Sequence, residues 1–336
     1  MKASRVRAMR GYTTIGETTI DRPLFVLGLP RSFTSVVCAM LGQHPQMYAL
    51  PEMQLFLAET VARWWQISLR STAPATHGAL RTVAQLYFGE QTVETVKLAR
   101  GWLWRRSHFS TGFLLEVLAT KVQPRILVDK TSIITYRPEF LRRAYRMFPK
   151  ARFIHLVRHP LGYGESVVKF LKERTKNGPL PSVHWLARLA YYPSLSAKER
   201  EHSEQRVDVD PQYAWYAFNI NVCEFLDSVP DEQKLRIRGE DLLQDPDRGL
   251  REIAAWMGLR TDIEAIEEMK HPERSPYACF GPPGARFGND RFFLERPALR
   301  PERAEPHTLV GPLPWREDGR ELMPEVIELA RQFGYR

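Results

Sequence analysis

Cysteine is scarce in this sequence. The 336 residues include only three, Cys38, Cys223 and Cys279, which lie far apart along the chain. They have neither the close spacing of a metal site nor the number and pattern of a disulfide framework. Because free cysteine is usually buried, the sequence predicts three reduced thiols in the core.

Long apolar runs are also absent. The longest ones, such as Pro23–Pro30, fall far short of the roughly 20 residues that cross a bilayer as a helix. The basic segment Met1–Gly11 lacks the apolar stretch of a secretory signal. These absences predict no membrane span and a cytoplasmic location.

A continuous run of basic residues is missing too, although 48 Lys and Arg against 39 Asp and Glu give a net charge of +9. The excess favours an anionic partner. Because the basic residues are scattered, we expect no nucleic-acid partner, and a small polyanionic ligand explains the charge equally well. The alternative, a nucleic-acid binder, would show steeply salt-dependent affinity.

Short apolar strands alternate with segments of helical periodicity. Helices are expected at Thr34–Leu41, at Pro138–Phe148, through Val167 and Leu171, and at Pro246–Met257, which ends at Gly258. The predicted strands that precede them are Leu24–Leu29, Ile126–Asp129, Arg152–Val157 and Lys234–Arg238. This order predicts an α/β fold with a central parallel sheet flanked by helices, whose ligands bind beyond the carboxyl ends of the strands.

The sequence predicts a single domain, residues 1–336. Within it, three regions interrupt the alternation of strands and helices. Residues 57–125 are mostly helical in pattern and rich in tryptophan, and residues 177–211 are polar and interrupted by proline. Both are expected to cover a substrate cleft, with peripheral packing as the alternative. Residues 271–320 are rich in proline and glycine and are expected to form an irregular loop region.

The first strand runs into a tight loop that opens a helix, in the segment Leu24–Val36. Free backbone N–H groups at the start of a helix suit a phosphate. Arg31 would add forked donors, and Thr34 and Ser35 would add hydroxyls. The loop lacks the Lys-Ser/Thr pair of a Walker A motif, which argues against an ATPase or GTPase. The alternative is a helix start with a solvated arginine.

Three segments together resemble the sulfotransferases that use 3'-phosphoadenosine 5'-phosphosulfate (PAPS). Gly28–Ser35 is similar to the family's 5'-phosphosulfate loop, G-x-P-R-S-G-T-[TS]. In the segment Phe153–Ser166, Arg158 and Ser166 keep the spacing of the family's 3'-phosphate element. Arg238–Pro246 is similar to a late strand exit that reads YEDL…DP, and the resemblance covers residues 23–260.

The resemblance implies a P-loop-like fold with PAPS as donor, its desulfated form PAP as product, and no metal. Arg158 and Ser166 would bind the 3'-phosphate, with a salt bridge as the alternative for Arg158. Arg286, in a glycine-rich segment that loosely resembles the family's late basic loop, would also bind there. The residues expected to bind the 5' end are Pro30, Arg31, Ser32, Phe33, Thr34 and Ser35.

Within the family, the chain resembles bacterial and tyrosylprotein enzymes more than cytosolic animal ones, because Ser132 stands where the latter place a histidine. The position of Glu52 resembles the tyrosylprotein pattern and that of polyketide-associated domains. Glu52 is therefore the expected general base, while Lys130 and Arg31 would stabilise the leaving phosphate. The alternatives are a solvated carboxylate for Glu52 and a surface lysine or ion pair for Lys130.

Two positions depart from the family pattern. Phe33 replaces a glycine, and we expect an ordinary backbone there with the ring lining the pocket. Gly239 replaces a tyrosine, to which no role is transferred. His155 and His44 are expected to be structural.

The leading hypothesis is PAPS-dependent sulfation of a hydroxyl on a small or lipid-like metabolite. The alternatives are sulfation of a carbohydrate or of a carrier-bound hydroxyacyl chain, and a protein that binds PAPS or PAP without turnover. A homodimer is compatible with the sequence, which does not fix the oligomeric state.

Overall fold

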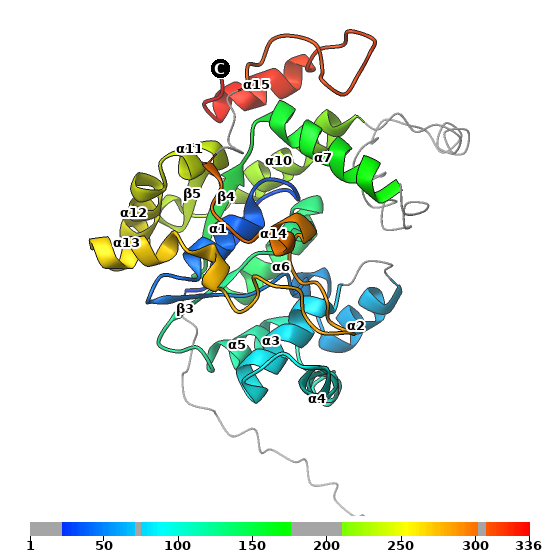
Figure 1. Cartoon of the computed structure of the whole chain (residues 1–336), viewed down its shortest axis with the longest axis vertical. Coiled ribbons are helices and arrows are strands. Elements are labelled where there is room, and N and C mark those ends of the chain that lie inside the picture. Colours follow the sequence, from blue (N-terminus) through cyan, green and yellow to red (C-terminus); the bar gives the residue numbers. More distant parts are fainter. Residues whose placement is uncertain (1–21, 71–74, 176–209, 302–306) are drawn as a thin grey trace, which may run out of the picture.

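The computed structural model describes residues 22–70, 75–175, 210–301 and 307–336 and contains a five-stranded sheet at its centre (Figure 1). The strand order is β2-β3-β1-β4-β5, and each neighbouring pair is parallel. The strands are β1 (Leu24–Leu27), β2 (Met47–Ala49), β3 (Ile126–Asp129), β4 (Arg152–Val157) and β5 (Lys234–Arg238). The expected parallel α/β fold is confirmed, whereas β2, three residues long, was not foreseen.

The strand β1 lies in the middle of the sheet and is buried along its whole length. Phe25 and Leu27 belong to one hydrophobic cluster, and Leu24 and Val26 belong to another. Successive side chains of a strand point to opposite faces, so both faces of the sheet are covered. An uninterrupted apolar run is typical of such a strand.

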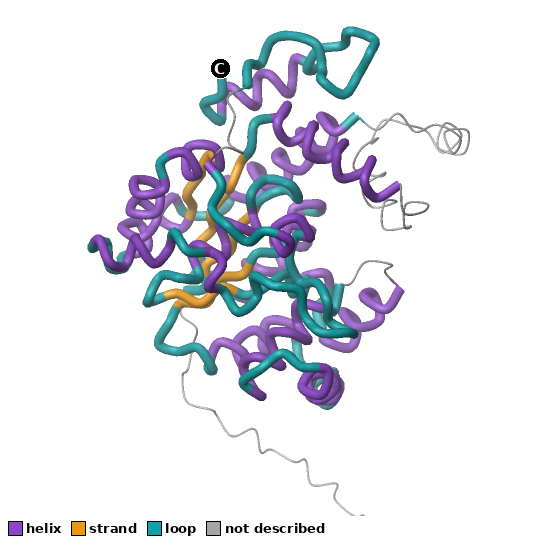
Figure 2. Tube along the Cα trace, in the orientation of Figure 1, coloured by secondary structure: helices purple, strands orange, loops and turns teal. Residues whose placement is uncertain are grey.

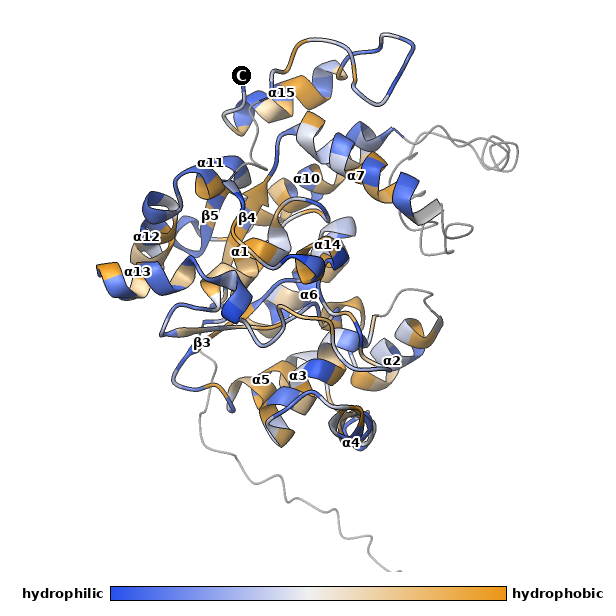
Figure 3. Cartoon of the chain, viewed as in Figure 1, coloured by the Kyte–Doolittle hydropathy of each residue, from blue (hydrophilic) through white to orange (hydrophobic). Residues whose placement is uncertain are grey.

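Helices cover the two faces (Figure 2). The second cluster also contains residues of α1 (Thr34–Leu41), α12 (Pro246–Met257) and α13 (Ile263–Met269), and α11 (Gly239–Gln244) packs beside them. The first contains residues of α6 (Pro138–Met147) and of the helical region between β2 and β3. Hydrophobic residues colour β4 and α1 in Figure 3, as expected for central elements.

The helical region between β2 and β3 confirms the helical pattern of residues 57–125. It comprises α2 (Val61–Arg70), α3 (His77–Phe88), α4 (Val93–Trp104) and α5 (Thr111–Ala119), below the sheet in Figure 1. Trp64 and Trp102 are buried in the first cluster. Short 3-10 helices lie at Leu55–Leu57, Ser132–Tyr136, Asp231–Gln233 and Pro272–Arg274.

A third cluster joins α7 (Pro160–Thr175), α10 (Pro211–Asp227) and α15 (Pro324–Gln332). Most of the region 177–211 lies outside the described residues. Residues 271–320 are largely irregular where described, and besides the 3-10 helix at Pro272–Arg274 they contain a short α-helix that was not expected, α14 (Arg291–Glu295). In the described part of the chain, no helix has the length and apolar character needed to cross a membrane.

The cysteine prediction is correct for Cys38, which is buried, and wrong for Cys279, which is exposed. Cys279 lies in an irregular segment that buries the side chains of Tyr277 and Ala278, whereas the side chain of Cys279 itself is exposed. Cys223 is partly buried on α10.

Candidate active site

The loop between β1 and α1 has an unusual backbone. Arg31 has φ 73° and Phe33 has φ 60°, so two residues with side chains adopt the left-handed conformation. The expectation of an ordinary backbone at Phe33 is therefore wrong. Each such residue costs on the order of 1–3 kcal/mol and is common at functional sites. Gly28 begins the turn, and a Cβ there would lie 2.6 Å from Thr34 Cγ2 and 3.0 Å from the Leu156 carbonyl oxygen.

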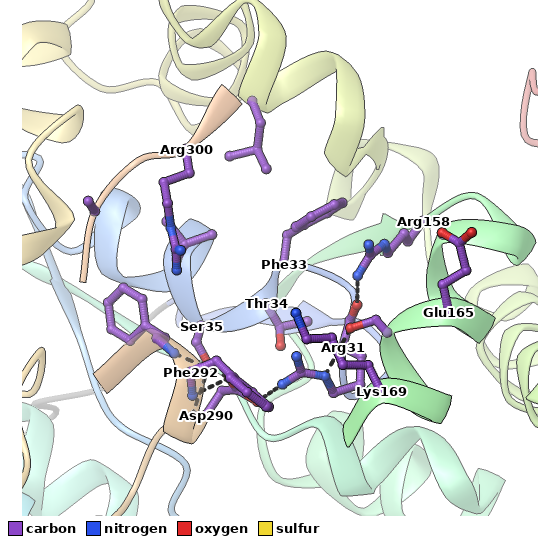
Figure 4. A pocket seen from close by; sticks show the side chains of 16 residues that line it. Arg31, Phe33, Thr34, Ser35, Arg158, Glu165, Lys169, Asp290, Phe292 and Arg300 are labelled. Carbon is purple, nitrogen blue, oxygen red and sulfur yellow. Dashed lines mark hydrogen bonds and ion pairs between the residues drawn. The ribbon is translucent and has the colours of Figure 1, made fainter. Parts of the chain in front are cut away.

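A cavity opens above this loop, at the carboxyl edge of the sheet (Figure 4). The loop, α7 and the segment around α14 form its walls. Its polar lining consists of the cations Arg31, Arg158, Lys169 and Arg300, the carboxylates Glu165 and Asp290, and the hydroxyls Thr34, Ser35 and Ser166. Because cations outnumber carboxylates, the cavity suits a polyanion. The rings of Phe33 and Phe292 also line it, as expected for Phe33. Pro30 and Ser32 lie in the loop but are not among the lining residues.

Arg158 directly follows β4, and its largely buried side chain lines the cavity. Its Nη1 donates a hydrogen bond to the Arg31 carbonyl oxygen, and its Cζ lies 4.3 Å from the centroid of the Phe33 ring. Burial lowers the pKa of Arg158 to about 10. Ser166, on α7, accepts a hydrogen bond of 3.1 Å from Arg31 Nε. The structure thus brings Arg158 and Ser166 to one cavity, with Arg31 between them.

Lys130 and Glu52 meet beside the same loop. Lys130 follows β3 and is fully buried; its Nζ donates to Ser35 Oγ at 3.0 Å and forms an ion pair with Glu52. The Glu52 side chain is 28% exposed, so this carboxylate lies between the buried lysine and solvent. The surface-lysine interpretation of Lys130 is wrong, because β3 and the loop enclose its side chain.

Asp129, the last residue of β3, is buried next to this pair. Burial raises the pKa of Asp129 to about 7. Its Oδ2 has no hydrogen-bond partner among the described residues. In the folded protein the neutral carboxyl group is therefore favoured below about pH 7.

Sequence reasoning missed the wall formed by residues 290–300. Asp290 forms an ion pair with Arg31, and its backbone N–H donates to Ser35 Oγ at 3.3 Å. The Phe292 ring lies 4.7 Å from Arg31 Cζ. One signal was available, because an aspartate before an apolar run is typical of a helix N-cap, and Asp290 does cap α14.

Arg286, expected at the 3'-phosphate, is not among the residues that line the cavity. Its side chain is exposed, and its Cζ lies 5.2 Å from the centroid of the Phe280 ring. The turn formed by Gly281–Arg286, closed by a 2.9 Å hydrogen bond between Gly281 N and the Arg286 carbonyl oxygen, holds this side chain outside. Arg300 supplies the cation from this region instead.

The histidines expected to be structural are structural. His155 is fully buried and bonds to Asn219 at 3.0 Å, and burial lowers its pKa to about 3. His44 bonds to the Arg260 carbonyl oxygen at 3.0 Å. Within the described ranges, no group of three or more His, Cys, Asp or Glu side chains is placed to hold a metal ion.

Comparison with protein families gives a match over most of the chain. Residues 23–263 match the model described as "Sulfotransferase family". The nodulation protein NoeE of Sinorhizobium fredii is 29% identical over 170 residues, which are 49% of this chain and 36% of that protein. The match thus spans about a third of the length of this curated relative.

Two solved structures share the fold. A sulfotransferase domain from the curacin biosynthetic pathway has a TM-score of 0.70 at 20% identity, covering 94% of this chain and 98% of that domain. A sulfotransferase domain from the olefin synthase of Synechococcus PCC 7002 has a TM-score of 0.67 at 23% identity, covering 94% and 96%.

Proposed function

This chain belongs to the sulfotransferase family, and we propose that it transfers the sulfuryl group of PAPS to a hydroxyl of a small or lipid-like metabolite. The observation that carries the proposal is the cavity itself. It places Arg31 and the start of α1 next to Arg158 and Ser166. PAPS carries a phosphosulfate at its 5' end and a phosphate at its 3' position, so it needs two neighbouring anion sites.

The 5' end is assigned to the loop Pro30–Ser35. The first N–H groups of α1 and the hydroxyls of Thr34 and Ser35 would donate to the phosphosulfate. Arg31 would contribute forked donors once its ion pair with Asp290 is released. The 3'-phosphate is assigned to Arg158 and Ser166.

Glu52 is the proposed general base. As the acceptor oxygen attacks sulfur, Glu52 takes the hydroxyl proton, and the bond from sulfur to the bridging oxygen breaks. The electron pair of that bond stays on the departing phosphate. Lys130 and Arg31 would stabilise this charge, which is the main demand of such a group transfer. The buried Lys130 needs little reorganisation, because Ser35 and Glu52 already hold its ammonium group.

Calorimetric titration with PAP tests the donor site. We expect measurable affinity, and its absence would overturn the proposal. Labelled PAPS with a panel of hydroxyl acceptors then tests transfer. The panel includes small lipid-like alcohols, sugars and hydroxyacyl thioesters, because carbohydrate and carrier-bound acceptors are the alternatives. A cytoplasmic location and a homodimer stay predictions.

The substitution Glu52→Gln separates an enzyme from a protein that only binds the nucleotide. We expect PAP affinity to persist while turnover falls about 10²–10⁴-fold, the usual contribution of general base catalysis. Glu59→Gln is the matched control, because Glu59 is also an ion-paired carboxylate before α2 but contacts Arg143 and Arg146. Unchanged turnover in Glu52→Gln would exclude Glu52 as the base.

A further inference from the structure

Gly239, the first residue of α11, faces the ring of Phe33. A Cβ built on Gly239 would lie 2.5 Å from Phe33 Cδ2 and 3.3 Å from Phe33 Cε2. Gly239 is not among the glycines with positive φ. Its backbone therefore permits any residue, and the ring is what excludes a side chain.

Phe33 presents the opposite situation. Its φ of 60° lies in the region that favours glycine, so a large side chain here has a conformational cost on the order of 1–3 kcal/mol. The family pattern has glycine at the position of Phe33 and tyrosine at that of Gly239. This chain has the aromatic ring in the loop before α1 and the glycine at the start of α11, which is the reverse of the pattern that it resembles.

The Phe33 ring supports a cation. The Arg158 Cζ lies 4.3 Å from the ring centroid, and Arg158 Nη1 donates to the Arg31 carbonyl oxygen. The Arg158 Nε has no hydrogen-bond partner among the described residues. The Phe33 ring thus contacts one face of the guanidinium, and the Arg31 carbonyl oxygen accepts a hydrogen bond from Nη1. The Nε–H group of Arg158 is left to donate to an anion. Figure 4 shows the Phe33 ring beside Arg158 at the cavity.

We propose that Phe33 is a positioning residue for Arg158, that Gly239 provides the space its ring requires, and that this pair sets the preference of the site for a nucleotide with a 3'-phosphate. The inference rests on the proposed function, because it assigns the 3'-phosphate to Arg158. A purely structural role for Phe33 is the competing interpretation, since the ring also packs against the second hydrophobic cluster.

The readout is the ratio of the affinities for PAP and 5'-AMP, which differ only in the 3'-phosphate. The wild type should favour PAP. Phe33→Ala and Phe33→Gly should both lower the ratio by about tenfold, the value of a partly desolvated cation–π contact. Of the two, Phe33→Gly should melt at the higher temperature, because glycine relieves the left-handed strain.

The substitution Gly239→Ala completes a double-mutant cycle. In the wild type the new methyl group collides with the ring, so we expect the ratio to fall. In Phe33→Gly the space is open, and Gly239→Ala should change neither the ratio nor the melting temperature appreciably. Trp256→Ala is the matched control, because Arg152 Cζ lies 5.1 Å from the Trp256 ring centroid on an element outside the cavity.

An unchanged ratio in Phe33→Gly, with only a shift in melting temperature, would mean that the ring merely packs and would overturn the inference. Additive effects of the two substitutions would overturn the role of Gly239. If the wild type fails to bind PAP at all, the proposed function fails and this inference fails with it. Failure of the proposed function is recognised by the absence of PAP binding in the wild type, and failure of this inference alone by an unchanged affinity ratio in Phe33→Gly.

Discussion

The two walls of the cavity differ in how they are built. The sheet wall includes Arg158, which directly follows β4 and lines the cavity. Lys130, which follows β3, does not line the cavity but lies behind this wall and donates to the lining residue Ser35, and the cationic groups of both residues are held by buried contacts. The covering wall consists of residues 290–300, with one short helix, and it contributes Asp290, whose carboxylate pairs with Arg31. We infer that the sheet wall provides a preorganised positive field, whereas the covering wall adds Arg300 and, through Asp290, competes with the ligand for Arg31.

Among the variants that test the two walls, Lys130→Met should reduce turnover the most, and a small loss would contradict the preorganised field assigned to the sheet wall. Turnover should fall about 10²–10³-fold, as when one preorganised donor to a developing negative charge is removed, while PAP affinity changes less. Lys234→Met is the control, because Lys234 is a partly exposed, ion-paired lysine at the amino end of β5. A loss of turnover below tenfold would show that Lys130 is structural.

The substitution Asp129→Asn tests how the burial of the Asp129 carboxyl group affects the free energy of unfolding. The pKa of Asp129 is raised by burial to about 7 in the folded protein, from about 3.9 in an unfolded chain. Between these values the folded state binds one proton more, so the free energy of unfolding should decrease with rising pH by up to about 1.4 kcal/mol per unit. Asparagine mimics the neutral acid, so this slope should disappear and the variant should be the more stable protein above pH 7. Urea unfolding from pH 4 to pH 8 measures both, and equal slopes would contradict the burial argument.

Arg158→Met addresses the 3'-phosphate. A lost charge-assisted hydrogen bond of about 1.5–3 kcal/mol predicts PAP affinity lower by about 10–100-fold. Affinity for 5'-AMP should stay the same. Arg286→Met in the same assay tests the assignment made from the sequence, and a larger loss there than in Arg158→Met would show that the loop 281–289 moves over the cavity on binding.

The sheet wall could be predicted from the sequence because its signals are local. A buried strand such as Arg152–Val157 is a short apolar run, and the residue after it must lie at the carboxyl edge of a parallel sheet. Arg31, Ser35, Lys130 and Arg158 were placed at one edge by this logic, and the structure brings them together.

The covering wall could not be predicted in the same way. An irregular segment has no regular spacing of apolar residues that would indicate which part of the protein it packs against. Asp290 is about 260 residues away from its partner Arg31, and only the path of the chain brings them together. Arg286 was expected at the 3'-phosphate because the segment around it loosely resembles a basic loop of the family, yet the turn at Gly281–Arg286 directs its side chain outward. Arg300, which sequence reasoning did not single out, lines the cavity instead. The left-handed backbone of Phe33 was missed for a related reason, since the ring that this backbone orients lies beside Gly239, about 200 residues away at the start of α11.

The substitution Asp290→Asn, which concerns the covering wall alone, should have the smallest effect on ligand binding. In Asp290→Asn the side chain keeps its size and its ability to cap α14, but the ion pair with Arg31 loses its charge. A partly exposed ion pair contributes about 0.2–1 kcal/mol, so PAP should bind up to about fivefold more tightly. Glu295→Gln is the control on the same helix, since Glu295 pairs with Arg291 away from the loop. The gain should shrink as salt screens the competing carboxylate. Weaker binding of PAP by Asp290→Asn would instead show that Asp290 contributes to nucleotide binding. Both walls of the cavity would then bind the nucleotide.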